Sequence, residues 1–315
     1  MWSLGFRAMG CEMQALVDAE TEAANAALAR VPLWFAEWER VLSRFQADSE
    51  LMRLNRQAGR EPVAVSPVLW DVLQAALAAY DESQGLVTPT LLRALEAAGY
   101  DRSFADLALD ATPLGPVPAH VLEIPDLTES VVLDPAARTV RLRHGAQLDF
   151  GGVAKGWAAE QAVRRLSAHG PALVEAGGDI AVSGPRQTGA GWPVAVADPQ
   201  LPNLNLTQLT LTGGGVATSG RDFRRWQQAG QWQHHLLDPR TGRPAITDVL
   251  SATVVAPTLR AAEAAAKAAL IQGGAAGLAW IEARPPLAAL LVLEDGRVLH
   301  SSRLGPHLAQ PAFSL

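Results

Sequence analysis

The residues best suited to chemistry stand near the middle of the chain, around two pairs of glycines. Asp149 ends a short apolar run and is followed by Gly151-Gly152 and then by Lys155. A second pair, Gly177-Gly178, leads directly into Asp179. Paired glycines at the start of a helix let the backbone approach a ligand and leave N–H groups free, and an ammonium there could meet a phosphate. The spacing indicates a phosphate-binding turn, with two ordinary tight turns and a solvated lysine as the alternative.

Two common phosphate-binding motifs are excluded by the residues of this turn. Lys155 is followed by Gly156 and Trp157, whereas the lysine of a P-loop is followed by serine or threonine. The glycine spacing also differs from the dinucleotide-binding fingerprint. The turn must therefore be interpreted from its own residues.

A strand, a turn, a helix and a further strand would position these groups. The apolar residues 148–150 predict a short strand, and alanines at steps of four predict a helix over residues 154–166. His169-Gly170-Pro171 should end that helix. Extended segments over residues 172–174 and 180–182 should follow, on either side of the second glycine pair.

The remaining patterns predict an α+β fold of mixed or antiparallel sheets packed with helices. Helical patterns cover residues 19–42, 66–82 and 259–272, a loose alternation predicts one strand over residues 6–17, and residues 131–142 predict a hairpin. The proline-rich residues 102–129 predict an irregular segment. We expect residues 1–315 to form a single unit around a ligand cleft, with two intimate α+β lobes as the alternative.

Composition limits which binding partners and which cellular compartment we expect for this protein. The 315 residues are 49% hydrophobic and 18% charged, which is typical of a globular protein with an ample core. The net charge of −6 provides no basic field, so we expect no nucleic-acid partner. The single cysteine, Cys11, excludes an intrachain disulfide and a cysteine-rich metal site. Because no apolar run reaches membrane-spanning length and no secretory signal is evident, we expect a cytoplasmic protein without a membrane segment, or an exported form with a trimmed leader.

Four segments together resemble the FAD:protein FMN transferase family, also called ApbE. They are LDFGGVAKGWAAE, LVEAGGDIAVSG, VATSGRDFRRW followed by HHLLDPRTGRP, and SATVVAP followed by an alanine-rich helix. Weaker matches, FRAMGCEMQ, FQADSELMRLN and GLVTPT, fall in family order, so the resemblance covers nearly the whole chain. It implies an α+β enzyme with a flavin cleft that uses magnesium. Such an enzyme cleaves FAD, transfers FMN to a threonine hydroxyl of an acceptor flavoprotein and releases AMP.

The resemblance also implies flavin-binding roles for residues that lie far apart in the sequence. Met9 belongs to an early Met-Gly motif that here ends in Cys11, where the family usually has threonine. Thr88 stands where the family often has an aspartate, so its hydroxyl would have to serve instead. Ser219 could bind ligand or simply close a strand. The candidate flavin-binding residues are Met9, Phe45, Leu86, Val87, Thr88, Asp149, Lys155, Ser219 and Leu237.

The implied magnesium site departs from the family pattern. The family has aspartate on the late helix and threonine four residues later, with a backbone carbonyl from the glycine turn, which is Gly152 here. This chain has Glu263 and Lys267, which share a helix face, but an ammonium has no lone pair for a metal. Two interpretations stay open: a plain helix ion pair, or a Lys267 ammonium that replaces part of the divalent charge while at most one ion is kept by Glu263 and Gly152. We therefore expect Mg²⁺ to bind and leave the number of ions open.

Attack of a hydroxyl on a pyrophosphate requires neutralised phosphates and an acceptor for the proton. Lys155 suits the first task, and His235 and Asp238 are the candidates for the second. His234 and His235 would point in opposite directions in an extended chain, so one of them can face the site. Three functions stay open: an FMN transferase, an FAD pyrophosphatase that uses water, and an FAD-binding protein without catalysis.

Overall fold

The structure, a computed structural model, describes residues 1–109, 123–201 and 203–309. Within these ranges, eight strands form a central sheet in which every neighbouring pair is antiparallel. Their spatial order is β1 (Trp2–Ala8), β2 (Cys11–Val17), β6 (Ala172–Ala176), β7 (Asp179–Val182), β10 (Gly214–Gly220), β15 (Val249–Ala256), β16 (Ala288–Leu293) and β17 (Val298–His300). The predicted α+β class is confirmed.

Smaller sheets flank the central one. A three-stranded sheet contains β3 (Val63–Ala64), β5 (Thr139–Leu142) and β4 (Val131–Asp134), so the hairpin predicted over residues 131–142 is confirmed. Three two-stranded sheets pair β8 (Trp192–Ala197) with β9 (Asn205–Leu211), β11 (Arg225–Gln228) with β12 (Gln231–His234), and β13 (Leu237–Asp238) with β14 (Arg243–Pro244).

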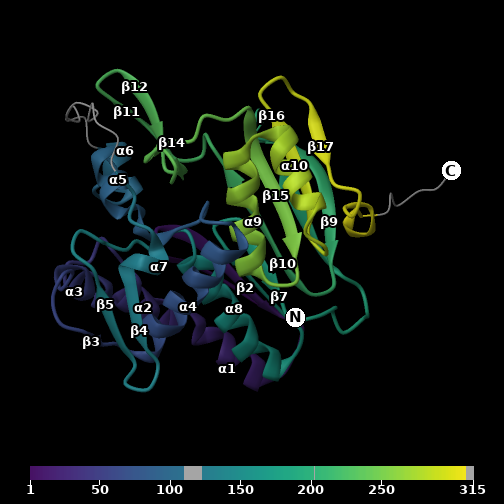
Figure 1. The fold of residues 1–315 in the computed structure, drawn as a ribbon. Coiled ribbons are helices and arrows are strands. Elements are labelled where there is room, and N and C mark those ends of the chain that lie inside the picture. Colours follow the sequence, from purple (N-terminus) through teal and green to yellow (C-terminus); the bar gives the residue numbers. More distant parts are fainter. Residues whose placement is uncertain (110–122, 202, 310–315) are drawn as a thin grey trace.

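The α-helices in the described residues are α1 (Glu22–Ala29), α2 (Val31–Leu42), α3 (Glu50–Arg56), α4 (Pro67–Glu82), α5 (Leu92–Ala97), α6 (Phe104–Leu109), α7 (Leu127–Ser130), α8 (Ala154–Leu166), α9 (Leu259–Gln272) and α10 (Gly274–Glu282). Figure 1 shows α9 and α10 lying over β10, β15 and β16, while α1, α2, α4 and α8 gather over the other half of the molecule. None of the helices in the described parts of the chain has the length and apolarity that a bilayer span requires.

The two faces of the sheet are covered by different elements. Successive side chains of a strand point to opposite faces. In β16, Ala289 and Leu291 therefore pack in the core beneath α9 and α10, whereas Leu290 and Val292 pack in the core shared with β8 and β9. Burial on both faces explains why β16 is apolar throughout.

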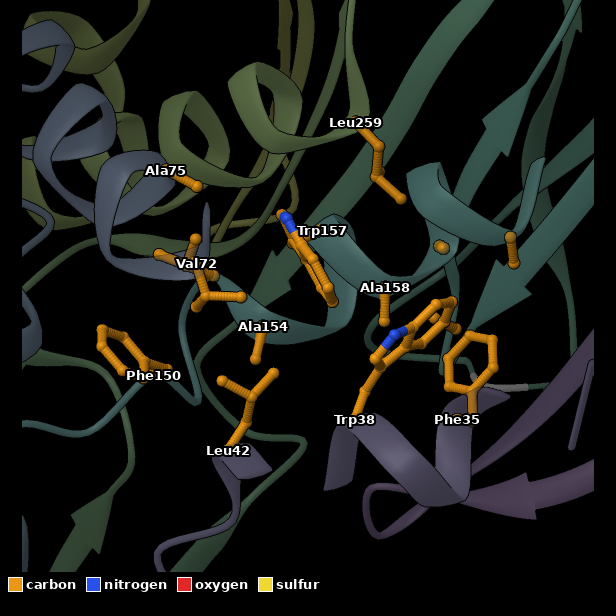
Figure 2. Close-up of a cluster of buried hydrophobic side chains, with 14 of the residues drawn as sticks. Phe35, Trp38, Leu42, Val72, Ala75, Phe150, Ala154, Trp157, Ala158 and Leu259 are labelled. Carbon is orange, nitrogen blue, oxygen red and sulfur yellow. The ribbon is translucent and has the colours of Figure 1, made fainter. Parts of the chain in front are cut away.

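Helix α8 lies at the centre of the helical layer. Figure 2 shows Trp157 of α8 between Val72 of α4 and Leu259 of α9. The ring centroids of Trp157 and Trp38 of α2 are 5.4 Å apart in an edge-on arrangement. This packing fixes the first turn of α8, which carries Lys155, relative to the sheet.

Two predicted elements are wrong for reasons of backbone geometry. Residues 6–17 form the hairpin of β1 and β2 and not one strand, because Met9 (φ 50°) and Gly10 (φ 71°) make a two-residue turn with positive φ at both positions. Residues 148–150 belong to no strand. The side-chain amide of Asn55 accepts from the Leu148 N–H at 2.8 Å and donates to the Leu148 carbonyl at 2.9 Å, in the place of a neighbouring strand.

Other predictions differ in extent. The helix over residues 19–42 is two helices, α1 and α2, with Pro32 in the first turn of α2. Helix α10 and the hairpin of β11 and β12 were not predicted. Of the segment 102–129, both ends contain a helix, α6 and α7, and residues 110–122 lie outside the described part. The helices predicted over residues 66–82, 154–166 and 259–272 are confirmed, and Ser66 caps α4 by accepting from the Leu69 N–H at 3.3 Å.

Candidate active site

A cavity of about 440 Å³ lies where the glycine turn, α8, α9 and β10 meet. That volume is within the range of small-molecule sites. Every candidate site residue except Asp238 lines it. The lining also includes residues that the sequence did not single out, among them Glu39, Arg44, Tyr100, Phe104 and Arg224. The candidate set therefore converges on one cavity although it spans residues 9 to 267.

Lys155 and the buried Asp179 form an ion pair in this cavity. Lys155 Nζ donates to Asp179 Oδ2 at 3.1 Å, and the other carboxylate oxygen accepts from the Thr218 N–H at 3.1 Å. Burial by itself lowers the pKa of Lys155, but the Asp179 and Glu263 carboxylates outweigh it, so the pKa lies above its ordinary value. The ammonium therefore stays charged at neutral pH. Asp179, which follows the second glycine pair, holds the cation in place.

A second ion pair comes from α9. Lys267 Nζ donates to Glu263 Oε1 at 2.9 Å, and Glu263 is 2% exposed. The other oxygen, Oε2, has no hydrogen-bond partner among the described residues and lies against α8, where a Cβ added to Gly156 would approach it to 2.5 Å. Lys267 lies against the glycine turn, because a Cβ on Gly152 would be 3.4 Å from Lys267 Cε. Gly152, Glu263 and Lys267 are thus adjacent, as expected.

The donors at this place do not fit a tightly held magnesium ion. Mg²⁺ requires oxygen ligands in near-octahedral geometry. Among the described residues, no group of three or more His, Cys, Asp or Glu side chains could hold a metal. Glu263 offers one free oxygen, but its other oxygen already holds an ammonium. At 4 Å and an effective dielectric constant of 20, a divalent ion and an ammonium repel by about 8 kcal/mol, twice the value for two unit charges.

Asp149 organises the glycine turn. Its Oδ1 accepts from the Gly151 N–H at 2.9 Å, so one of the two glycine amides expected to be free is bound within the turn. Arg44 Nε lies 3.7 Å from the other carboxylate oxygen. Helix α8 begins just beyond, and Val153 at its N-cap position provides no side-chain hydrogen bond. The positive end of the α8 dipole therefore adds to the charge of Lys155 on this side of the cavity.

Aromatic rings line another part of the cavity. The Arg44 guanidinium lies 4.2 Å from the ring centroid of Phe45 and 4.5 Å from that of Tyr100. Arg44 is buried, and its Nη2 has no hydrogen-bond partner among the described residues. Tyr100 in turn packs on Trp226 of β11, with ring centroids 5.2 Å apart. This wall could flank a planar ring and donate a hydrogen bond to it.

The turn between β1 and β2 reaches the cavity because β2 pairs with β6. The Met9 N–H donates to Glu39 Oε2 at 3.1 Å, which ties this strained turn to α2. Cys11 lies beside Gly177, and Arg224 Nη2 donates to its Sγ at 2.9 Å. Residues near the start of the chain are thereby placed against the second glycine pair.

Of the two adjacent histidines, His235 lines the cavity and His234 faces Ala245. His235 Nδ1 is 3.4 Å from the Arg224 carbonyl oxygen, and His234 Nε2 is 3.2 Å from the Ala245 carbonyl oxygen. Burial, helped by the nearby Arg224 charge, lowers the pKa of His235 to about 3. The ring is neutral at physiological pH. If Nδ1 carries the proton for the carbonyl, Nε2 keeps a free lone pair.

Asp238 is the candidate that the structure does not bring to the cavity. It is absent from the lining, and its carboxylate accepts from the Arg240 N–H at 2.9 Å and from the Arg240 guanidinium at 2.7 to 3.1 Å. The sequence Asp-Pro-Arg-Thr-Gly forms a turn around this side chain, since the Thr241 and Gly242 N–H groups donate to the Asp238 carbonyl. Asp238 therefore stabilises the turn that follows the histidines.

The other candidate flavin-binding residues all border the cavity. Leu86, Val87 and Thr88 come from the segment after α4, and the Thr88 hydroxyl is 2.8 Å from that of Thr90. Ser219 of β10 and Leu237 of β13 complete the group. Sequence reasoning missed Arg44, Tyr100 and Arg224 as site residues. Arg44 directly precedes Phe45, but nothing in the sequence indicates that its guanidinium is buried.

Comparisons with known proteins agree on one family. The profile of the ApbE family matches residues 9–291. The FAD:protein FMN transferase of Treponema pallidum is 33% identical over 299 residues, covering 88% of this chain and 80% of the relative. The FAD:protein FMN transferase of Klebsiella pneumoniae is 31% identical over 238 residues, covering 73% of this chain and 71% of that relative.

Solved structures share the fold. The ApbE protein of Thermotoga maritima superimposes with a TM-score of 0.83 at 25% identity, covering 98% of this chain and 99% of that chain. The flavin transferase ApbE of Vibrio cholerae gives a TM-score of 0.75 at 22% identity, which supports the fold alone. Because the family profile covers most of the sequence and a relative at 33% identity spans most of it, the chain belongs to the ApbE family.

Proposed function

We propose that this transferase moves FMN from FAD to a threonine hydroxyl of an acceptor flavoprotein and releases AMP. The observation that carries the proposal is one cavity in which an aromatic wall meets two partly buried lysines and a neutral histidine. The isoalloxazine ring would pack against the wall that Phe45, Arg44 and Tyr100 form together. Lys155 and Lys267 would neutralise the pyrophosphate.

The reaction forms one phosphorus–oxygen bond and breaks another. The threonine oxygen attacks the phosphorus on the FMN side, and the bond to the AMP oxygen breaks. Burial lowers the pKa of His235, so its ring is neutral at neutral pH. In the tautomer whose Nδ1–H donates to the Arg224 carbonyl, Nε2 accepts the hydroxyl proton. The charge of the bound pyrophosphate would raise that pKa and make the imidazole a stronger base. No step is assigned to a divalent cation, since the donors do not fit one.

Chromatography of the nucleotides would test the proposal. The purified protein is incubated with FAD and an acceptor peptide, with a matched peptide in which valine replaces the threonine, or with no peptide. We expect AMP together with FMN-modified peptide only when the threonine is present. Free FMN and AMP in all three samples would indicate an FAD pyrophosphatase, and bound but intact FAD in all three would indicate a binding protein.

A further inference from the structure

We propose that the Lys267 ammonium, held by Glu263, is the resident counter-cation for the FAD pyrophosphate, and that this chain needs no bound divalent cation. The inference rests on the proposed function, because the pyrophosphate is the group that the cation would serve. It differs from the magnesium dependence that the resemblance implies, and it follows from the chemistry of the donors that are present.

The surroundings of the ion pair between Glu263 and Lys267 indicate that it does more than stabilise α9. Between residues 261 and 269, every residue other than Glu263 and Lys267 is alanine, and most of that stretch is buried. Burying two charges costs free energy that an ion pair in a helix interior does not by itself recover. The Lys267 side chain keeps 16% of its surface exposed, whereas that of Glu263 keeps 3%. Both residues line the cavity, and the Lys267 side chain is the more exposed of the two.

The charges balance before FAD binds. Two carboxylates, Asp179 and Glu263, hold two ammonium groups, Lys155 and Lys267, on the same side of the cavity. Each ammonium has three donors, and each makes one short bond to its carboxylate, at 3.1 and 2.9 Å. Both therefore retain donors for phosphate oxygens. Because the two carboxylates balance the two ammonium groups, Lys155 and Lys267 offer the pyrophosphate N–H donors and positive charge close to its oxygens, without a net charge of two.

FAD affinity provides a test that does not depend on catalysis. The dissociation constant of FAD is measured by flavin fluorescence in EDTA and in Mg²⁺. For the wild-type protein we expect the two values to agree within about twofold. Lys267→Met should weaken binding in EDTA by about 10- to 100-fold, the range for losing a hydrogen bond between charged groups. Wild-type binding that weakens more than about tenfold in EDTA would overturn the inference, as would normal binding by Lys267→Met.

Two further variants separate the role of Lys267 from damage to the fold. Lys267→Met leaves Glu263 buried without its cation, so the double variant E263Q/K267M provides a neutral pair that can pack. It should show the same loss of FAD affinity while its circular dichroism matches the wild type. Arg260→Met removes a positive charge from the same helix, where Arg260 pairs with Glu160 at 2.6 Å outside the cavity lining. That control should bind FAD normally.

Transfer rates then distinguish the two proposals. Equal FMN transfer by the wild type in EDTA and in Mg²⁺ supports both. Transfer that occurs only with Mg²⁺ overturns the inference and leaves the transferase standing. Tight FAD binding without transfer under either condition contradicts the proposed function, and the affinity measurements still decide the role of Lys267.

Discussion

Asn55→Ala removes both hydrogen bonds that hold the backbone of Leu148 beside the cavity. Asn55 is 2% exposed, and its amide pairs with the Leu148 N–H at 2.8 Å and with the Leu148 carbonyl at 2.9 Å. The substitution leaves one buried donor and one buried acceptor without partners. Each such group costs about 1–3 kcal/mol, so we expect the free energy of unfolding to fall by about 2–6 kcal/mol. Because Asp149 follows Leu148 directly, FAD affinity should fall as well.

Urea denaturation followed by circular dichroism would measure this loss, with FAD affinity measured on the same samples. Asn25→Ala is the matched control, since Asn25 is exposed on α1 and its replacement should change the free energy by less than about 0.5 kcal/mol. If Asn55→Ala lost no more stability than this control, water would be satisfying the Leu148 backbone. The Asn55 side chain would then not be the group that takes the place of a neighbouring strand for Leu148.

Three further results are expected. Gly156→Ala should lower the urea midpoint although alanine normally favours a helix, because the new Cβ meets Glu263 Oε2 and overpacking costs about 1–3 kcal/mol. Adding Glu263→Ala should remove this penalty. Between pH 6.5 and about 3, His235 binds a proton in the unfolded state but not in the folded state, because burial lowers its pKa in the folded state. The free energy of unfolding of the wild type should therefore fall by up to about 1.4 kcal/mol for each unit by which the pH is lowered. Denaturation of His235→Asn should show a weaker dependence on pH. Lys155→Met should cost about 3–5 kcal/mol in the same assay by leaving Asp179 buried without a cation, and adding Asp179→Asn should recover part of it.

Local rules were sufficient where one element decides its own geometry. The serine-proline start of α4, the alanine steps of α8 and the uninterrupted alanine run of α9 predict helices that the structure contains. The mixture of hairpins and helices predicts the α+β class. The prediction of a single unit over residues 1–315 stays a prediction. The candidate flavin and metal positions followed from the resemblance and not from any local rule.

Local rules failed where a distant group supplies the bond. Residues 148–150 look like a strand, yet a side chain from α3 satisfies the Leu148 backbone. Asp238 looks like a candidate acceptor for the hydroxyl proton, yet its carboxylate pairs with Arg240, two residues away. Neither outcome can be recognised from hydrophobic periodicity, which records which face of an element is apolar and not which partner it meets.

The sequence by itself determined α4, α8 and α9, most strands and the chemical types available to the site. Only the tertiary structure decided that Lys155 pairs with Asp179, that Glu263 holds Lys267 against the glycine turn, and that the Arg44 guanidinium is buried against two rings. The physical reason is that helix and turn formation depend on dihedral preferences and spacing within a few residues. Ion pairing and burial depend instead on the register of strands such as β2 and β6, which joins segments about 160 residues apart.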